Sequence, residues 1–291
     1  MVSPGDDYLP AAAETDEHTI RRHLAAVYRT CHRLGLNEGV CNHLSALVPG
    51  DEPYRFLVIR YGLSWDEVTP NNLVLCDCDG NIIAGTGPVE TTAMQIHAAV
   101  HMSDPAKYRC VLHTHMPYTT ALCVTDRFEL SMCHQNSLRF YDDVAYDHEY
   151  RGLVMDQDEG TRLAAALGGK RVLLHRCHGP IVTGDSVAAA FDSLYYLERA
   201  AMVQVLAMGT LAGGGRLCTI DEETTKQTKA LVDRELDYAA RCHLGARMRE
   251  LEDIDRRASG GRPCWRSAVA LATTAFLAGA LAHAGVTRWR A

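Results

Sequence analysis

Two histidines one residue apart, at the end of an apolar run, are the first feature of the sequence that could carry chemistry. They are His113 and His115, in the run Val-Leu-His-Thr-His at 111–115. Residues two apart in a strand face the same side of the sheet, so both imidazoles can converge on one divalent ion. The competing interpretation is a pair of histidines that are only hydrogen-bonded or exposed.

A second apolar run, at 172–174, ends in a similar way farther along the chain. It continues as His175-Arg176-Cys177-His178-Gly179, and we predict that His178 supplies a third metal ligand. We expect His175 to be structural and to point away from His178. Three neutral imidazoles leave positions open for water or substrate, which is typical of a catalytic metal site.

Strands and helices interleave around these histidines, and this order predicts a layered α/β fold. Apolar residues at helical spacing predict helices over 17–36, 90–102, 160–167, 186–211 and 221–250. Apolar runs bounded by turn residues predict strands over 41–49, 55–61, 72–78, 81–84, 110–113, 171–175 and 181–183. We expect a flexible arm over 1–15, one folded domain over 16–255 and a tail over 256–291.

Charge and cysteine content exclude several classes of function. The net charge is -7, which provides no basic face for nucleic acid and argues against an anionic membrane surface as the main partner. The 11 cysteines contain no pair of CxxC motifs, so a zinc ribbon is not expected. The start of the chain does not read as a signal peptide, and we therefore expect reduced thiols and a cytoplasmic location.

Residues 267–286 form an uncharged, apolar segment between arginines. Its length suits a membrane span, but it is rich in Ala, Gly and Thr and contains His283, which weakens insertion. We favour a helix that packs on the protein or on a partner subunit, or a loose tail, over a membrane anchor.

The chain resembles the class II aldolase/adducin domain family from about His18 to about Thr228. The matching motifs follow the family's order: Gly35–Gly39 with Asn42–Ser45, Tyr61-Gly62-Leu63, Val68-Thr69 with Asn72-Leu73, Asp79-Gly80-Asn81, His113-Thr114-His115, His178-Gly179 and Tyr196–Arg199. The resemblance implies a three-layer α/β/α domain with a largely antiparallel central sheet, and homo-oligomers that are often tetramers. It also implies a divalent metal, usually zinc, with Fe(II) or Mn as alternatives.

The sequence departs from the sugar-phosphate aldolases at their acid/base residue. In those enzymes a glutamate lies four residues before the histidine that matches His97, whereas this chain has Ala93 at that position. Glu90, about one helical turn away, is the candidate replacement, and a plain helix-terminal carboxylate is its alternative. Tyr141 lies in a polar and aromatic connection similar to one that overhangs the family's site. It is a candidate proton donor or substrate contact, with a packed aromatic ring as the alternative.

The positions that match the aldolases' phosphate pocket are also altered. Their asparagine corresponds to His43, and their paired serines correspond to Thr91 and Thr92. The two threonines keep hydroxyls at an expected helix start, so all three residues are candidates for substrate binding; they permit phosphate binding but do not indicate it.

We expect a metal-dependent lyase of class II aldolase type, which cleaves a C–C bond in a small carbonyl or hydroxy-carbonyl substrate through a metal-stabilised enediolate. One alternative is a non-heme iron oxygenase or decarboxylase on the same fold, since imidazole suits iron as well as zinc. The other is a non-catalytic, adducin-like, actin-binding scaffold, which would hold no tight metal. The presence of all three histidines favours an enzyme.

Overall fold

The computed structural model describes residues 10–50, 53–154 and 157–260. The chain divides into two compact units, Met1–Arg247 and Met248–Ala291. The first unit carries the sheet together with His113, His115 and His178, and the expected domain limits stay a prediction. The apolar segment 267–286 lies outside the described residues. Among the helices that are described, none has the length and apolar character that crossing a membrane requires.

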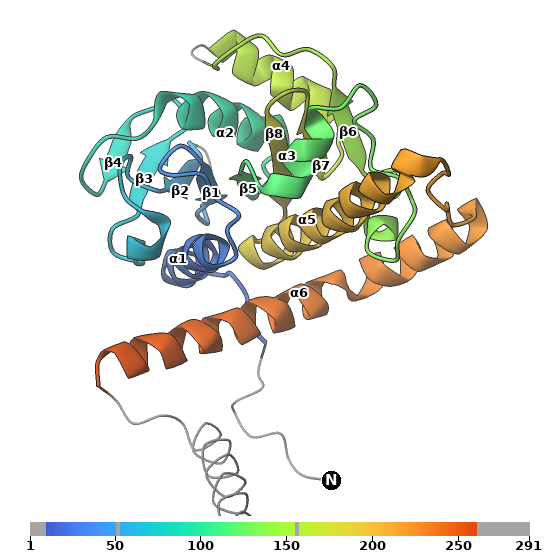
Figure 1. The fold of residues 1–291 in the computed structure, drawn as a ribbon. Coiled ribbons are helices and arrows are strands. Elements are labelled where there is room, and N and C mark those ends of the chain that lie inside the picture. Colours follow the sequence, from blue (N-terminus) through green and yellow to red (C-terminus); the bar gives the residue numbers. More distant parts are fainter. Residues whose placement is uncertain (1–9, 51–52, 155–156, 261–291) are drawn as a thin grey trace, which may run out of the picture. The chain divides into compact units, whose positions relative to one another are not determined.

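The centre of the first unit is one eight-stranded sheet, in the order β4-β3-β2-β1-β5-β8-β7-β6 (Figure 1). Its strands are β1 His43–Leu47, β2 Arg55–Val58, β3 Val74–Asp77, β4 Ile82–Ala84, β5 Cys110–His113, β6 Val144–Asp147, β7 Val172–His175 and β8 Gly179–Gly184. The pair β6–β7 is parallel, and the other neighbouring strands pair antiparallel. This confirms the predicted largely antiparallel sheet.

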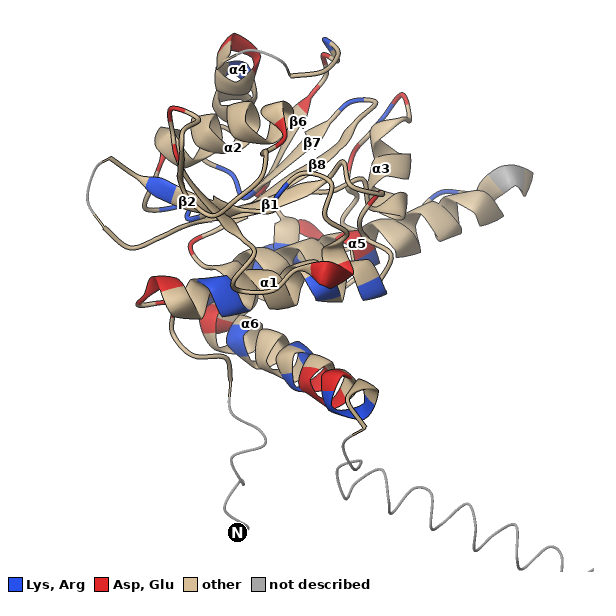
Figure 2. Ribbon diagram, turned by 90° about the vertical axis from the view of Figure 1, so that its left-hand side faces the viewer, with Lys and Arg blue, Asp and Glu red and all other residues tan. Residues whose placement is uncertain are grey.

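Helices cover both faces of this sheet. The α-helices of the described residues are α1 Glu17–Arg33, α2 Thr91–Ser103, α3 Pro117–Cys123, α4 Gln157–Leu167, α5 Val187–Thr210 and α6 Glu222–Ala258. Helices α2 and α4 lie on one face, and α1 and α5 lie on the other (Figure 2). The three-layer α/β/α architecture is therefore confirmed.

The layer formed by α2 and α4 is fixed to the sheet by a buried apolar cluster. Its members come from both helices, from β5, β7 and β8, and from adjoining segments: Ile96, Val100, Tyr108, Val111, Val154, Leu163, Ala164, Leu167, Leu173 and Ile181. The two helices also approach closely at Gly160, where an added Cβ would lie 2.4 Å from the carbonyl oxygen of Gln95. This packing holds α2 against β1 and β5, where several histidines lie.

Two segments differ from the sequence-based expectations. Strand β6 lies in the polar and aromatic connection that holds Tyr141, where no strand is expected. A four-residue strand has little pattern of its own, and its partner β7 begins 28 residues farther along the chain (Val144↔Val172). Residues 10–15 of the expected flexible arm are anchored. The backbone N–H of Ala11 donates to the carbonyl of Arg241 at 2.8 Å, and Glu14 accepts from the backbone N–H of Val187 at 2.9 Å.

Candidate metal centre

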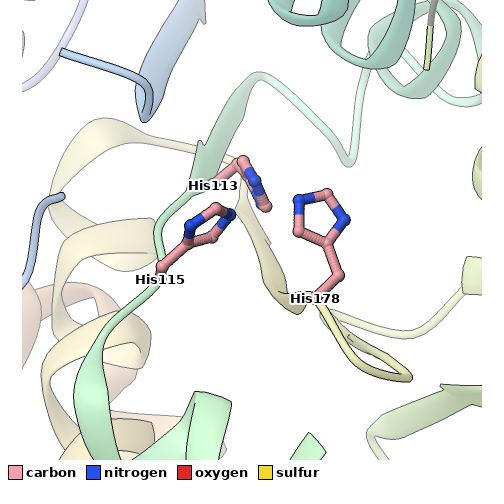
Figure 3. Close-up of side chains that lie close together, drawn as sticks. All are labelled: His113, His115 and His178. Carbon is pink, nitrogen blue, oxygen red and sulfur yellow. The ribbon is translucent and has the colours of Figure 1, made fainter. Parts of the chain in front are cut away.

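Sheet topology brings His113, His115 and His178 to one edge of the sheet. His113 is the last residue of β5, and His178 directly precedes β8. Because β5 and β8 are antiparallel, with His113 opposite Ile181, the end of one strand meets the start of the other. Figure 3 shows the three rings turned toward one another.

The three histidines are close enough to share one ion. Their ligand atoms all lie within 4.8 Å of one another. The ring centroids are 5.1 Å apart for His113 and His115, 4.7 Å for His113 and His178, and 4.9 Å for His115 and His178. A metal held by three imidazole nitrogens would keep coordination positions open for substrate.

Hydrogen bonds behind two of the rings leave their Nε2 atoms free. His113 Nδ1 lies 3.0 Å from the carbonyl oxygen of Pro180. A carbonyl only accepts, so Nδ1 carries the proton and Nε2 keeps its lone pair. His115 Nδ1 lies 2.5 Å from Glu38 Oε2, and its Nε2 is buried without a hydrogen-bond partner among the described residues. Outer partners of this kind orient metal-binding histidines.

A tight turn positions the third ring. Cys177 adopts a left-handed conformation with φ of 57°, and the backbone N–H of His178 donates to the carbonyl of His175 at 3.2 Å. Gly179 leaves no room for a side chain, since an added Cβ would lie 2.8 Å from the carbonyl oxygen of Thr114 and 3.2 Å from the His115 ring. His175, expected to point away, instead has its ring 5.1 Å from that of His178 and contacts Asp147 Oδ2 at 2.7 Å.

Burial keeps two of these histidines neutral at physiological pH. It lowers the pKa of His178 to about 3, with added repulsion from His175 and His115. It also holds the pKa of His113 well below its ordinary value, with repulsion from His178 and His43 as further causes. Neutral imidazole is the form that binds metal, so the donor set fits a divalent ion such as zinc, iron or manganese.

The predicted substrate residue His43 lies beside these three histidines. It is paired across the strands with His113, and the two ring centroids are 5.1 Å apart. The Nε2 atom of His43 faces Glu90 Oε2 at 3.7 Å. Glu90 is the N-cap of α2: its Oε2 accepts from the backbone N–H of Ala93 at 2.9 Å and from the hydroxyl of Thr92. The structure thus brings together His43, Glu90 and Thr92, while Thr91 is exposed at the first position of α2.

Tyr141 is not brought to the histidines of its own chain. It precedes β6, whose first residue pairs with the first residue of β7, whereas His178 follows the other end of β7. Its hydroxyl donates to Glu222 Oε1 at 3.0 Å, and this bond is the main cause that raises the pKa of Tyr141. Within one chain, Tyr141 is therefore not placed to donate a proton at this site.

Sequence reasoning missed the support behind His115. Asn42 accepts through Oδ1 from the backbone N–H groups of Glu38 at 2.7 Å and His115 at 3.2 Å. In the sequence, Asn42 and Glu38 stand out only as parts of the motifs 42–45 and 35–39. Their positions between a glycine turn and a strand indicate a special loop. They do not indicate that this loop contacts His115, which lies 73 residues after Asn42 and 77 residues after Glu38.

Comparisons with known proteins agree with this architecture. The model of the Class II Aldolase and Adducin N-terminal domain matches residues 22–205. An adducin-related protein of Schizosaccharomyces pombe is 33% identical in an alignment of 255 residues that covers 83% of this chain and 76% of that protein. The crystal structure of an aldolase II superfamily protein from Pseudomonas syringae superposes with a TM-score of 0.74 at 32% identity, covering 82% of this chain and 94% of the other. L-fuculose 1-phosphate aldolase from Glaciozyma antarctica shares the fold, with a TM-score of 0.70 at 24% identity, covering 84% of this chain and 93% of that one.

Proposed function

Because the chain belongs to the class II aldolase and adducin family, we propose that it is a metal-dependent lyase. It would cleave a C–C bond in a small hydroxy-carbonyl substrate. The observation that carries this proposal is the convergence of His113, His115 and His178, whose ligand atoms lie within 4.8 Å of one another. Two of these rings offer a free Nε2 because Pro180 and Glu38 hold their Nδ1 atoms.

A divalent ion held by these histidines would polarise a substrate carbonyl and stabilise the negative charge that develops on it. The chain's own residues would then orient the substrate and move its protons. Glu90 is our candidate acid/base, because its carboxylate is fixed at the N-terminus of α2 and faces His43 at 3.7 Å. His43, Thr91 and Thr92 are candidates for substrate contacts. The role of Tyr141 as a proton donor or substrate contact stays a prediction, and a single chain does not bring Tyr141 to the three histidines. The tetramer and the cytoplasmic location stay predictions as well.

A scaffold without catalysis is the second candidate function. It is supported by the similarity to the adducin-related protein of Schizosaccharomyces pombe. Such a protein would need no metal, and the buried Nε2 of His115, which has no hydrogen-bond partner in the described part of the chain, would then be a polar group without compensation. For this reason we favour the enzyme.

Elemental analysis of protein purified without oxygen tests the proposal. The comparison uses the wild type, the variant His113→Ala/His115→Ala and a control, His18→Ala/His32→Ala, which removes two exposed histidines. We expect close to one ion per chain in the wild type and control and almost none in the site variant, since two of three ligands are gone.

The identity of the ion separates the remaining alternatives. Zinc would favour the lyase, and iron would favour an oxygenase or decarboxylase on the same fold. If the wild type bound no metal even after reconstitution, both enzyme hypotheses, the lyase and the oxygenase or decarboxylase, would fail and the non-catalytic scaffold would remain.

A further inference from the structure

A continuous line of hydrogen-bonded side chains runs from the metal centre into the interior. His43 Nδ1 lies 2.7 Å from His97 Nε2, His97 Nδ1 contacts Ser45 Oγ, and Ser45 Oγ lies 2.7 Å from His101 Nε2. The exposed fraction of each of these four residues is 2% or less. We call His43, His97, Ser45 and His101 the buried histidine chain.

The inner end of the buried histidine chain fixes the direction of its hydrogen bonds. His101 Nδ1 lies 2.6 Å from the carbonyl oxygen of Tyr108. A carbonyl oxygen only accepts, so His101 Nδ1 carries a proton. The ring is fully buried and burial lowers the pKa of His101 to about 4, so the ring is neutral and its Nε2 is an acceptor.

Each following bond then has one allowed direction. Ser45 must donate its single hydroxyl proton to His101 Nε2, so its oxygen accepts from the Nδ1–H of His97. Burial holds the pKa of His97 well below its ordinary value, so this ring is also neutral and its Nε2 accepts. The proton between His43 and His97 must therefore lie on His43 Nδ1.

As a result, His43 presents a bare Nε2 lone pair at its other end. Reversing the chain would set an unprotonated His101 Nδ1 against the Tyr108 carbonyl, two acceptors 2.6 Å apart, which is unfavourable. The Glu90 carboxylate lies 3.7 Å from His43 Nε2. Two acceptors side by side favour a donor group between them and repel an anion.

We propose that His43 orients the substrate by accepting a hydrogen bond from one of its free hydroxyl groups, so that the enzyme takes a hydroxy-carbonyl compound and not its phosphate ester. His97, Ser45 and His101 are positioning residues, which hold His43 in this tautomer. The proposal rests on the proposed function, because it concerns the substrate of the same metal centre. A site built to pair with a hydroxyl discriminates strongly against an analogue that lacks the donor, since its acceptor is left unpaired.

The tautomer of His43 can be measured without any bound substrate. Long-range ¹⁵N–¹H correlation spectra of histidine-labelled, zinc-loaded protein report which ring nitrogen bears the proton, and the signal absent from a His43→Asn variant assigns His43. We expect the proton on Nδ1 in the wild type. A proton on Nε2 would make His43 a donor toward the site and would overturn the proposal.

Paired probes test the substrate class. Dihydroxyacetone and dihydroxyacetone phosphate differ only in the group that replaces one hydroxyl. We expect zinc-loaded wild type to bind the free alcohol at least about tenfold more tightly, the size of one well-made hydrogen bond. His43→Asn introduces an amide donor and should shrink or invert this preference, while His32→Ala, an exposed control, should leave it unchanged.

The outcomes separate this inference from the proposed function. Equal or tighter binding of the phosphate ester by the wild type would overturn the inference, even with metal bound. Loss of zinc from His43→Asn would overturn it as well, because His43 would then be a ligand. Absence of metal from the wild type would overturn the proposed function instead, and the tautomer spectrum would still decide the direction of the chain.

Discussion

Two sets of three histidines lie side by side in this protein and use their ring nitrogens in opposite ways. In the ligand set, His113, His115 and His178, nitrogens converge on one another and the Nε2 of His115 has no partner among the described residues. In the buried histidine chain, His97 and His101 use both ring nitrogens in hydrogen bonds. The difference teaches that burial of histidine alone does not indicate a metal site; the indication is an unpaired, converging nitrogen.

The two sets also differ in what would complete them. A cation would compensate the lone pairs of the ligand set, whereas both ring nitrogens of His97 and of His101 are already hydrogen-bonded within the chain and to the carbonyl of Tyr108. Changes to the chain should therefore alter folding stability and leave metal in place. Changes around the ligand set should alter metal affinity and leave stability nearly unchanged.

Acid should produce the largest effect; the buried histidine chain contributes to it together with His178 of the ligand set, whose pKa is also lowered. The folded pKa of His101 is about 4, below the ordinary value near 6.5, so the unfolded state binds more protons between these values. The free energy of unfolding should be highest above about pH 6.5 and fall as the pH drops toward 4. His101 alone should contribute a loss of roughly 3 kcal/mol.

Urea titrations of the wild type and His101→Leu at several pH values measure this contribution. The variant should be less stable at neutral pH. Its free energy of unfolding should fall less steeply as the pH drops, because it lacks one group that takes up a proton on unfolding. The exposed control His32→Ala should follow the wild type. Identical slopes for wild type and His101→Leu would show that His101 does not titrate below its ordinary range.

Ser45→Ala should have the next largest effect. It leaves His97 Nδ1 and His101 Nε2 without the hydroxyl that joins them, and unpaired buried polar groups should lower the free energy of unfolding by about 2 kcal/mol. Ser137→Ala is a matched control, because that buried hydroxyl makes a bond of 2.7 Å to the carbonyl of His134 and its loss should cost about 1 kcal/mol. Denaturant unfolding gives both values, and elemental analysis should find unchanged metal. Metal loss in Ser45→Ala would erase the distinction between the two sets.

Glu38→Gln should act on the ligand set alone. Glu38 accepts from His115 Nδ1 at 2.5 Å, and loss of its charge should weaken metal binding about tenfold. Its side chain is 67% exposed, so the free energy of unfolding of the metal-free protein should change by less than about 0.5 kcal/mol. Chelator competition measures the affinity. Glu38→Ala, which removes the acceptor, should weaken binding further, and an unchanged affinity there would mean that His115 needs no support from Glu38.

The ligand set could be predicted from the sequence because its signals are local. The expected strand Cys110–His113 agrees with the structure residue by residue, and the two-residue spacing of His113 and His115 has one geometric meaning in a strand. His178 was expected to join them because a similar apolar run precedes it, and the structure brings its ring beside theirs. Patterns within a few residues were sufficient here.

The buried histidine chain could not be predicted in this way. Ser45 meets His97 and His101 across 52 and 56 residues, a contact that depends on how α2 crosses β1. Tyr141 shows the same limit, because its distance from the ligand set depends on the direction of β6 relative to β7. Residue types suggested chemistry at these positions, but the topology decides which of them meet.

The smallest effect should come from the turn that carries His178. Cys177 has φ of 57°, a left-handed conformation that costs an ordinary L-residue about 1 kcal/mol and that asparagine tolerates better. Cys177→Asn should therefore raise the free energy of unfolding by less than about 1 kcal/mol, whereas the β-branched Cys177→Val should lower it by about 1 kcal/mol. Cys177 is exposed, so lost packing should not obscure the comparison.

Metal affinity of the same two variants links this turn to the ligand set. If the left-handed residue sets the direction of His178, Cys177→Val should bind metal more weakly than Cys177→Asn, and the asparagine variant should match the wild type. Thermal unfolding of the metal-free proteins and chelator competition of the loaded ones give the two quantities separately. Equal metal affinity in both variants, together with the expected difference in stability, would mean that Gly179 and the start of β8 position His178 without help from the turn.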